Sequence, residues 1–163
     1  MTLTTFALAG QSFRLRRAVE GDVAGIVGLM AADQLRAAVD STAPERRAPY
    51  LAAFHAIDAD PAHLLCVVED AAGTVVGTMQ LTYLPGLARG GATRQQIEAV
   101  RVSADLRGNG LGSAMIAWAV EEAGRRGATL VQLTSDNSRT DAHRFYERLG
   151  FVQSHAGFKL HLA

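Results

Sequence analysis

Arg107-Gly108-Asn109-Gly110-Leu111-Gly112 is the stretch of this sequence that says most about its fold. It follows a predicted strand that ends at Val102 and opens a predicted helix over residues 110–124. Glycines let the backbone turn sharply and approach a ligand closely, and the first N–H groups of a helix attract anions. The stretch therefore predicts a phosphate-binding turn, although a lone glycine triplet also occurs in ordinary turns before helices.

Three kinds of phosphate-binding loop compete for this stretch. A Walker A loop needs Gly-Lys-Ser/Thr, and Leu111-Gly112-Ser113 has no lysine. A dinucleotide fingerprint needs a third glycine where Ser113 stands, directly after a strand, and the predicted strand ends too early. The remaining pattern is R/Q-x-x-G-x-G/A, which Arg107 to Gly112 match without a gap.

A second motif follows in the predicted helix over residues 141–149. Ala142, Tyr146, Gly150 and Phe151 fit the pattern A-x-x-x-Y-x-x-x-G-F. With both motifs in this order, the chain resembles the GNAT N-acetyltransferases over residues 74–162. Two positions depart from the family pattern, since Ala104 stands where proline is common and Asn137 precedes Ala142 by five residues instead of three.

Periodicity gives the remaining elements. Alternating apolar residues predict strands around residues 13–15 and over residues 63–69, 74–84, 96–102, 129–134, 151–154 and 158–162, and helical spacing predicts further helices over residues 23–30 and 50–57. This order indicates an α/β (α+β) fold with a mixed sheet flanked by helices. The resemblance implies a mostly antiparallel sheet of about seven strands and about four helices. It also implies a splayed, bulged strand before the glycine loop. We expect one domain over residues 1–163, with residues 1–12 as a flexible tail or edge segment.

The resemblance implies acetyl-CoA as co-substrate. The pyrophosphate would lie on the glycine loop and the start of its helix, and the preceding strand would pair with the pantetheine arm and the thioester carbonyl. The implied cofactor-binding residues are Val100, Arg101, Val102, Arg107, Gly108, Asn109, Gly110, Leu111, Gly112, Ser113, Asn137, Ala142 and Phe145.

Two residues are candidates for proton transfer. Tyr146 is the implied general acid, because a phenol near pKa 10 and a thiol near pKa 8.5 exchange a proton readily; a packed helix tyrosine is the alternative. Strand phase predicts that Glu98 shares a face with Val100 and Val102, where a carboxylate needs water, a cation or a substrate amine. Glu98 is therefore a candidate base or amine anchor, with a salt bridge to an arginine as the alternative.

Composition limits the other possibilities. Sixteen basic and 16 acidic residues give a net charge of zero, which argues against nucleic-acid binding. We find no apolar stretch of membrane-spanning length. A single cysteine, Cys66, and five histidines without metal-ligand spacing predict a cytoplasmic chain with no metal and no acyl-cysteine intermediate. In the predicted loop over residues 85–94, Arg89 and Arg94 can meet an acidic substrate group, but exposed loop arginines usually contact only solvent.

The expected function is transfer of an acetyl group from acetyl-CoA directly to a primary amine. The acceptor is a small molecule or a peptide, and no motif identifies it. An acyl-CoA-binding sensor without turnover is the alternative, and an interaction module that keeps only the fold ranks last. The family resemblance adds that a homodimer is common.

Overall fold

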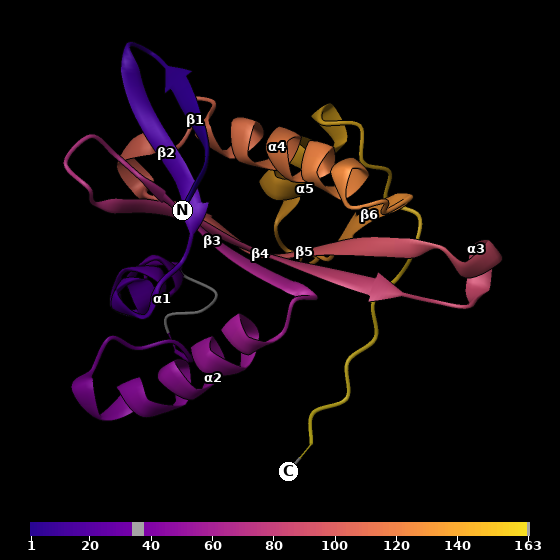
Figure 1. The fold of residues 1–163 in the computed structure, drawn as a ribbon, viewed down its shortest axis with the longest axis horizontal. Coiled ribbons are helices and arrows are strands. Elements are labelled where there is room, and N and C mark those ends of the chain that lie inside the picture. Colours follow the sequence, from indigo (N-terminus) through magenta and orange to yellow (C-terminus); the bar gives the residue numbers. More distant parts are fainter. Residues whose placement is uncertain (34–37, 163) are drawn as a thin grey trace. The chain divides into compact units, whose positions relative to one another are not determined.

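A computed structural model describes residues 1–33 and 38–162. The chain forms two compact units, Met1–Gln132 and Leu133–Ala163, here called the N-terminal and the C-terminal unit. Figure 1 shows the helices and strands of both. None of the helices in the described residues is long and apolar enough to cross a membrane.

A six-stranded sheet in the order β1-β2-β3-β4-β5-β6 organises the N-terminal unit. The first five strands pair with their neighbours in antiparallel register. Hydrogen bonds from the Thr129 amide to the Thr93 carbonyl (2.9 Å) and between the Gln132 and Gln96 side chains (2.7 Å) join β6 to β5. The strands are β1 Thr2–Leu8, β2 Gln11–Arg17, β3 His63–Glu69, β4 Val75–Pro85, β5 Thr93–Val102 and β6 Leu130–Leu133.

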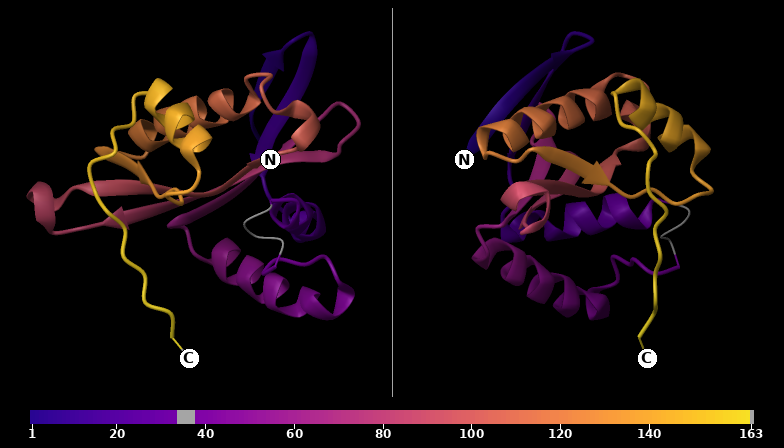
Figure 2. Two further views of the ribbon diagram at one scale, coloured as in Figure 1. Left: turned by 180° about the vertical axis from the view of Figure 1, so that it is seen from behind. Right: turned by 90° about the vertical axis from the view of Figure 1, so that its right-hand side faces the viewer.

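Helices cover both faces of this sheet (Figures 1 and 2). One face carries α4, and the other carries α1 and α2. The α-helices are α1 Val23–Ala31, α2 Arg47–Ala59, α3 Ala88–Gly91, α4 Leu111–Arg125 and α5 Thr140–Arg148, with 3-10 turns at Glu20–Asp22, Pro44–Arg46 and Ala104–Leu106.

Small residues let the helices approach the sheet closely. A Cβ atom built on Gly77 of β4 would lie 3.2 Å from Met115 Sδ of α4, and one on Gly25 of α1 would lie 3.2 Å from Val75 Cβ of β4. The apolar core on the α1–α2 side consists of Ala18, Val23, Ile26, Val27, Phe54, Leu65 and Val67. On the other side, α4 buries Leu111, Met115, Ile116, Trp118, Ala119 and Ala123.

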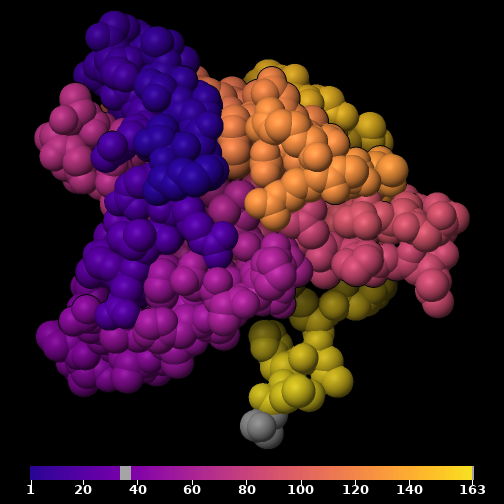
Figure 3. Space-filling model, viewed as in Figure 1, coloured from indigo at the N-terminus to yellow at the C-terminus, as the bar shows by residue number. Residues whose placement is uncertain are grey.

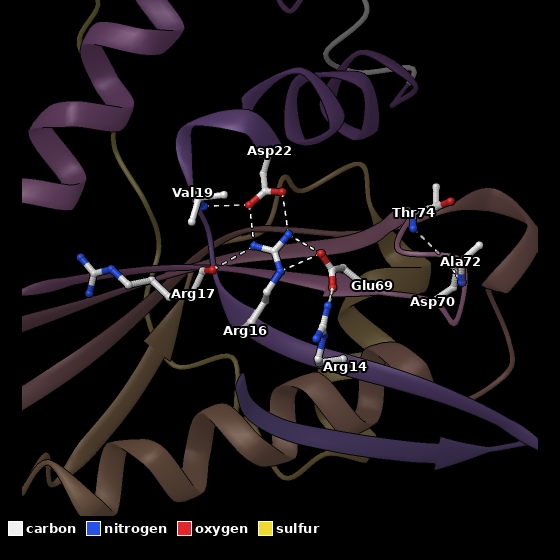
Figure 4. A network of polar contacts seen from close by, with 9 residues as sticks. All are labelled: Arg14, Arg16, Arg17, Val19, Asp22, Glu69, Asp70, Ala72 and Thr74. Carbon is white, nitrogen blue, oxygen red and sulfur yellow. Dashed lines mark hydrogen bonds and ion pairs between the residues drawn. The ribbon is translucent and has the colours of Figure 1, made fainter. Parts of the chain in front are cut away.

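A buried group of charges ties β2 and β3 to the turn before α1 (Figure 4). Arg16 donates to both carboxylate oxygens of Asp22, at 2.6 and 2.7 Å, and through Nε to Glu69 at 2.7 Å. Arg14 also binds Glu69. Hydrogen bonds from Arg16 hold the pKa of Glu69 below its usual value. Burial raises the pKa of Asp22, but the bonds from Arg16 and the Val19 amide outweigh it and lower that pKa.

The predicted fold class is confirmed, with six strands in place of about seven. Residues 151–154 and 158–162, predicted as strands, lie outside any sheet. Phe158, Leu160 and Leu162 alternate with other residues as in a strand, but their side chains are exposed. Alternation alone does not make a strand, because a strand also needs a hydrogen-bonded neighbour. Residues 2–8, in contrast, pair with β2 as an edge strand.

The β4–β5 hairpin differs from prediction at its tip. Residues 85–94 were predicted as a loop, whereas β4 runs to Pro85, β5 starts at Thr93, and the short α3 turns the chain between them. The tip is exposed in Figure 3, with Leu87 fully accessible. Arg94 therefore belongs to a strand, which fixes the direction of its side chain relative to the sheet.

Candidate active site

A β-bulge interrupts β5 just before the glycine loop. Thr78 pairs with Arg101 and Gln80 pairs with Glu98, so Ala99 and Val100 together stand opposite the single residue Met79. Ala99 has a φ of 52°, the left-handed conformation that occurs in some bulges. The bulge expected before the glycine loop is thus present, and it disrupts the ladder where the strand would meet a thioester.

The bulge changes the face on which Glu98 lies. Thr78 and Gln80 are two residues apart on β4 and share a face, so their partners Arg101 and Glu98 share it too. The prediction that Glu98 shares a face with Val100 and Val102 is wrong, because the extra residue reverses the alternation. Glu98 is exposed on the α1–α2 side, next to Gln80. None of the described arginines forms an ion pair with Glu98.

Arg101 has structural partners. Its Nε lies 3.2 Å from Asp33 Oδ2, with both side chains largely buried, and its Nη1 donates to the Val100 carbonyl at 2.7 Å. Val102 stands opposite Gly77, and the next residue, Ser103, donates its amide to Val76 at 2.8 Å. The predicted cofactor-binding strand is therefore held in place from both sides of the bulge.

The glycine loop leads from β5 into α4 through one 3-10 turn. Gly108 and Gly110 have φ values of 83° and 85°, which favour glycine, and a Cβ on either would meet nothing within 4 Å. The hydrogen bonds of α4 begin at Ala114, whose amide donates to the Gly110 carbonyl at 3.0 Å. No side chain caps this helix start. The amides of Leu111, Gly112 and Ser113 therefore have no hydrogen-bond acceptor among the described residues, which fits a bound phosphate.

Side chains around this helix start divide into two roles. Leu111 is buried in the core, so it can meet a cofactor only through its backbone. The Arg107 side chain is exposed, and its Nε donates to the Val102 carbonyl at 3.3 Å. Within the described residues no carboxylate forms an ion pair with Arg107, which leaves its charge available to an anion.

The second motif builds a helix end in the C-terminal unit. Gly150 has a φ of 89° and ends α5, and the Phe151 amide donates to the Tyr146 carbonyl at 3.1 Å. This turn packs the Phe151 ring edge-on against Tyr146, with centroids 5.9 Å apart, while Phe145 lies 5.0 Å from Tyr146. The motif positions Gly150 and Phe151 thus orient the Tyr146 ring, and Ala142 lies one turn earlier in α5.

Asn137 lies in an exposed turn between β6 and α5. Asp136 shapes this turn by accepting hydrogen bonds from the Ser138 amide (2.9 Å) and hydroxyl (2.6 Å), which also lower the pKa of Asp136. The carbonyl of Asp136 is 2.9 Å from His143 Nε2. His143 thus contacts the backbone of this turn.

The structure brings one part of the predicted site together and leaves the other in a separate unit. One set of residues lies along β5, the glycine loop and the start of α4: Glu98, Val100, Arg101, Val102 and residues 107–113. Asn137, Ala142, Phe145 and Tyr146 belong to the C-terminal unit.

An apolar cavity of about 90 Å³ lies on the α1–α2 side of the sheet. Its single amide-bearing wall residue is Gln80, the cross-strand partner of Glu98. The sequence alone did not reveal it, because it depends on how α1 and α2 pack. Its walls are Val23, Ile26, Val27, Met30, Tyr50, Ala53, Phe54, Ile57, Leu65 and Gln80.

Cys66 is fully buried in β3, and burial raises the pKa of its thiol to about 12. A thiol that is neutral and inaccessible at neutral pH is a poor nucleophile. Across residues 1–33 and 38–162 no three His, Cys, Asp or Glu side chains are grouped to hold a metal ion.

Comparison with known proteins places this arrangement in a family. The model of the acetyltransferase (GNAT) family matches residues 29–151. A curated relative, an aminoalkylphosphonate N-acetyltransferase of Salmonella typhimurium, is 46% identical over 63 residues, which are 39% of this chain and 41% of that protein. The chain thus aligns with less than half the length of this relative.

Solved structures match over nearly the whole chain. A Bacillus halodurans protein described as a transcriptional regulator is 39% identical with a TM-score of 0.88, covering 92% of this chain and 99% of that one. A Trypanosoma brucei acetyltransferase is 28% identical with a TM-score of 0.74, covering 92% and 99%. By its family match and these relatives, the chain belongs to the acetyltransferase (GNAT) family.

Proposed function

We propose that residues 1–163 are one enzyme domain that transfers an acetyl group from acetyl-CoA directly to a primary amine. The observation that carries the proposal is the run from the bulge at Ala99 to the uncapped start of α4, residues 99–113. It offers backbone groups for a thioester and helix amides for a pyrophosphate in the order that the cofactor requires.

For the donor, we assign the pyrophosphate to the amides of residues 108–113 and to the charge of Arg107. Acetyl-CoA would supply the activated acetyl group. The backbone at Val100, Arg101 and Val102, beside the bulge, would align its pantetheine arm. The motif similarity extends the assignment to Asn137, Ala142 and Phe145.

For the acceptor, we assign Glu98 as the base or amine anchor. Its exposed position before the bulge, without an ion-pair partner among the described residues, supports this role. An ammonium near pKa 10 is mostly protonated at neutral pH and must lose a proton before it can attack. Glu98 would receive that proton directly or through a water molecule.

Tyr146 is our candidate for the general acid that protonates the departing thiolate. Its support is the second motif and the packing of its ring between Phe145 and Phe151. These contacts fix the orientation of the ring, and a proton donor must be held in a defined position.

The acceptor class follows from one relative. The Salmonella protein is named for aminoalkylphosphonates, so small amines of this kind are the first acceptors to test, before peptides. We also propose a cytoplasmic location, since the single cysteine is a buried thiol, and no role for nucleic acid, membrane or metal. Dimer formation rests on the family resemblance alone.

A panel assay tests the proposal. Purified protein is incubated with acetyl-CoA and single amines, and both released CoA and the N-acetylated product are measured. We expect the two to appear in equal amounts with at least one small amine. Tight binding of acetyl-CoA without product from any amine would favour the alternative, a sensor that binds acyl-CoA without turnover. We include this alternative because the Bacillus halodurans relative is described as a transcriptional regulator.

A further inference from the structure

The sheet face that carries Glu98 also carries a line of polar side chains. On β5, Arg94, Gln96 and Glu98 alternate with Gln95 and Ile97, which are buried on the α4 side. Their partners on β4 are Leu84, Thr82 and Gln80. The N-terminal half of β5 therefore presents cation, amide and carboxylate in sequence on the α1–α2 side.

The amide in the middle of this line has a fixed orientation. Gln132 Nε2 donates to Gln96 Oε1 at 2.7 Å. On the other side, Thr82 stands opposite Gln96, and its Oγ1 is 3.0 Å from His63 Nδ1. Because the Gln96 oxygen accepts from Gln132, its NH₂ group keeps two N–H donors, which suit an acceptor oxygen of a ligand.

The two ends of the line carry uncompensated charges. Arg94 is exposed, and none of the carboxylates in the described part of the chain forms an ion pair with it. Beyond the bulge, by comparison, Arg101 is neutralised by Asp33 at 3.2 Å. Glu98 likewise has no ion-pair partner among the residues described. β5 thus carries the cation of Arg94 and the anion of Glu98 on the same face, four residues apart.

The spacing of these charges suits a small molecule. Four strand residues span about 13 Å between Cα atoms. The long arginine side chain and the carboxylate of Glu98 can both lean along the strand and shorten that gap. A ligand with an ammonium at one end and an acidic group at the other would complement both charges and reach Gln96 between them.

We propose that the acceptor is a small zwitterion: an amine that also bears a carboxylate, phosphate or phosphonate. Its amine lies at Glu98, and its acidic group is bound by Arg94 with help from the Gln96 amide. This inference rests on the proposed acetyl transfer and adds the recognition of the acidic group. Arg94 then acts as a specificity-determining residue.

Matched acceptors test the inference. The probes are an aminoalkylphosphonate, an aminoalkylcarboxylate and a neutral alkylamine of the same chain length, each with acetyl-CoA. The measured quantity is the ratio of kcat/KM for an acidic acceptor to kcat/KM for the neutral one. We expect this ratio to exceed 1 in the wild type and to fall roughly 10- to 100-fold in Arg94→Gln, as for a lost charge-assisted hydrogen bond. Arg94→Lys should retain part of the preference for the acidic acceptor, because lysine keeps the positive charge.

Arg89→Gln is the control, because Arg89 is another arginine of the same hairpin but lies in the turn and not on the strand. It should leave the ratio unchanged. A wild type that prefers the neutral amine, an unchanged ratio in Arg94→Gln, or an equal fall in both variants would each overturn the inference. Failure of every amine to be acetylated would instead overturn the proposed function itself. The phosphonate and carboxylate arms show which acidic group is preferred.

Discussion

Ala99 adopts a backbone conformation that alanine seldom takes. Its φ of 52° costs about 1–2 kcal/mol relative to the right-handed region. Such strain persists where the surrounding pairing fixes it, and here Thr78–Arg101 and Gln80–Glu98 fix both sides. The strained residue directly follows Glu98, so it determines which way Glu98 faces.

If Glu98 receives the proton of the acceptor amine, Glu98→Gln should lower kcat/KM most at low pH. Free amine is scarcest there, and the loss should shrink as the pH approaches the pKa of the amine. A pH profile of kcat/KM with the true acceptor measures this. Glu121→Gln, on the exposed side of α4, should match the wild type at every pH. A loss of equal size at all pH values would assign Glu98 a positioning role.

Tyr146→Phe removes one hydroxyl and keeps the ring that packs on Phe145 and Phe151. If the phenol protonates the leaving thiolate, kcat should fall about 10²- to 10⁴-fold with little change in the KM for acetyl-CoA. Steady-state kinetics and a thermal melt of both proteins separate chemistry from folding. Near wild-type turnover, when the chemical step limits the rate, would mean that another donor acts.

At the scale of elements, α4 rests on the sheet at a glycine. Gly77 leaves room for Met115, and its own Cβ would also lie 3.4 Å from the Arg101 carbonyl. The same contact therefore positions the helix whose start would hold the pyrophosphate and the strand next to the bulge. Packing and site geometry are coupled at this point.

Gly77→Ala should destabilise the fold by about 1–3 kcal/mol, because the added methyl group overfills a packed contact. Gly124→Ala is the control, since Gly124 lies on an exposed position of α4 with nothing within 4 Å. That change should be neutral or stabilise slightly, by about 0.5–1 kcal/mol. Urea unfolding of the three proteins gives the values. Equal stability of Gly77→Ala and wild type would show that the sheet and α4 do not meet as described.

The sequence predicted the elements that carry strong local signals. The helix after the glycine loop and the β3–β4 hairpin were predicted, because helical periodicity and an Asp-x-x-Gly turn depend on neighbouring residues. The Asp70 side chain indeed accepts bonds from the Ala72 and Thr74 amides, at 3.0 and 2.8 Å. The face of Glu98 was mispredicted, because a bulge depends on the register with β4. The Arg101–Asp33 contact and the apolar cavity depend on distant residues in the same way.

At the scale of the whole molecule, stability depends on the buried charges of Arg16, Asp22 and Glu69. Both carboxylates have folded-state pKa values below their ordinary ones. Their contribution is therefore fully present above about pH 5, where both carboxylates are ionised in the unfolded chain too, and is lost as the pH falls through the folded values. Arg16 stays charged throughout, since these bonds raise its pKa further.

Asp22→Asn should lower the free energy of unfolding by about 1–3 kcal/mol at neutral pH, because Arg16 loses one of its two carboxylate partners and keeps Glu69. It should also flatten the fall in stability below about pH 5. Asp58→Asn, which breaks the exposed pair with Arg17, should cost about 1 kcal/mol or less. Urea unfolding at several pH values measures both. An Asp22 variant with the acid sensitivity of the wild type would contradict the assignment.

We propose that the uncapped start of α4 holds the pyrophosphate of acetyl-CoA, and calorimetric titration with acetyl-CoA measures this binding. Gly110→Asp places a negative charge at this helix start, whereas Gly110→Asn adds a neutral side chain of similar size that tolerates the left-handed φ of 85°. We predict that Gly110→Asp binds at least about tenfold more weakly than Gly110→Asn. Equal affinities of the two folded variants and the wild type would contradict the claim.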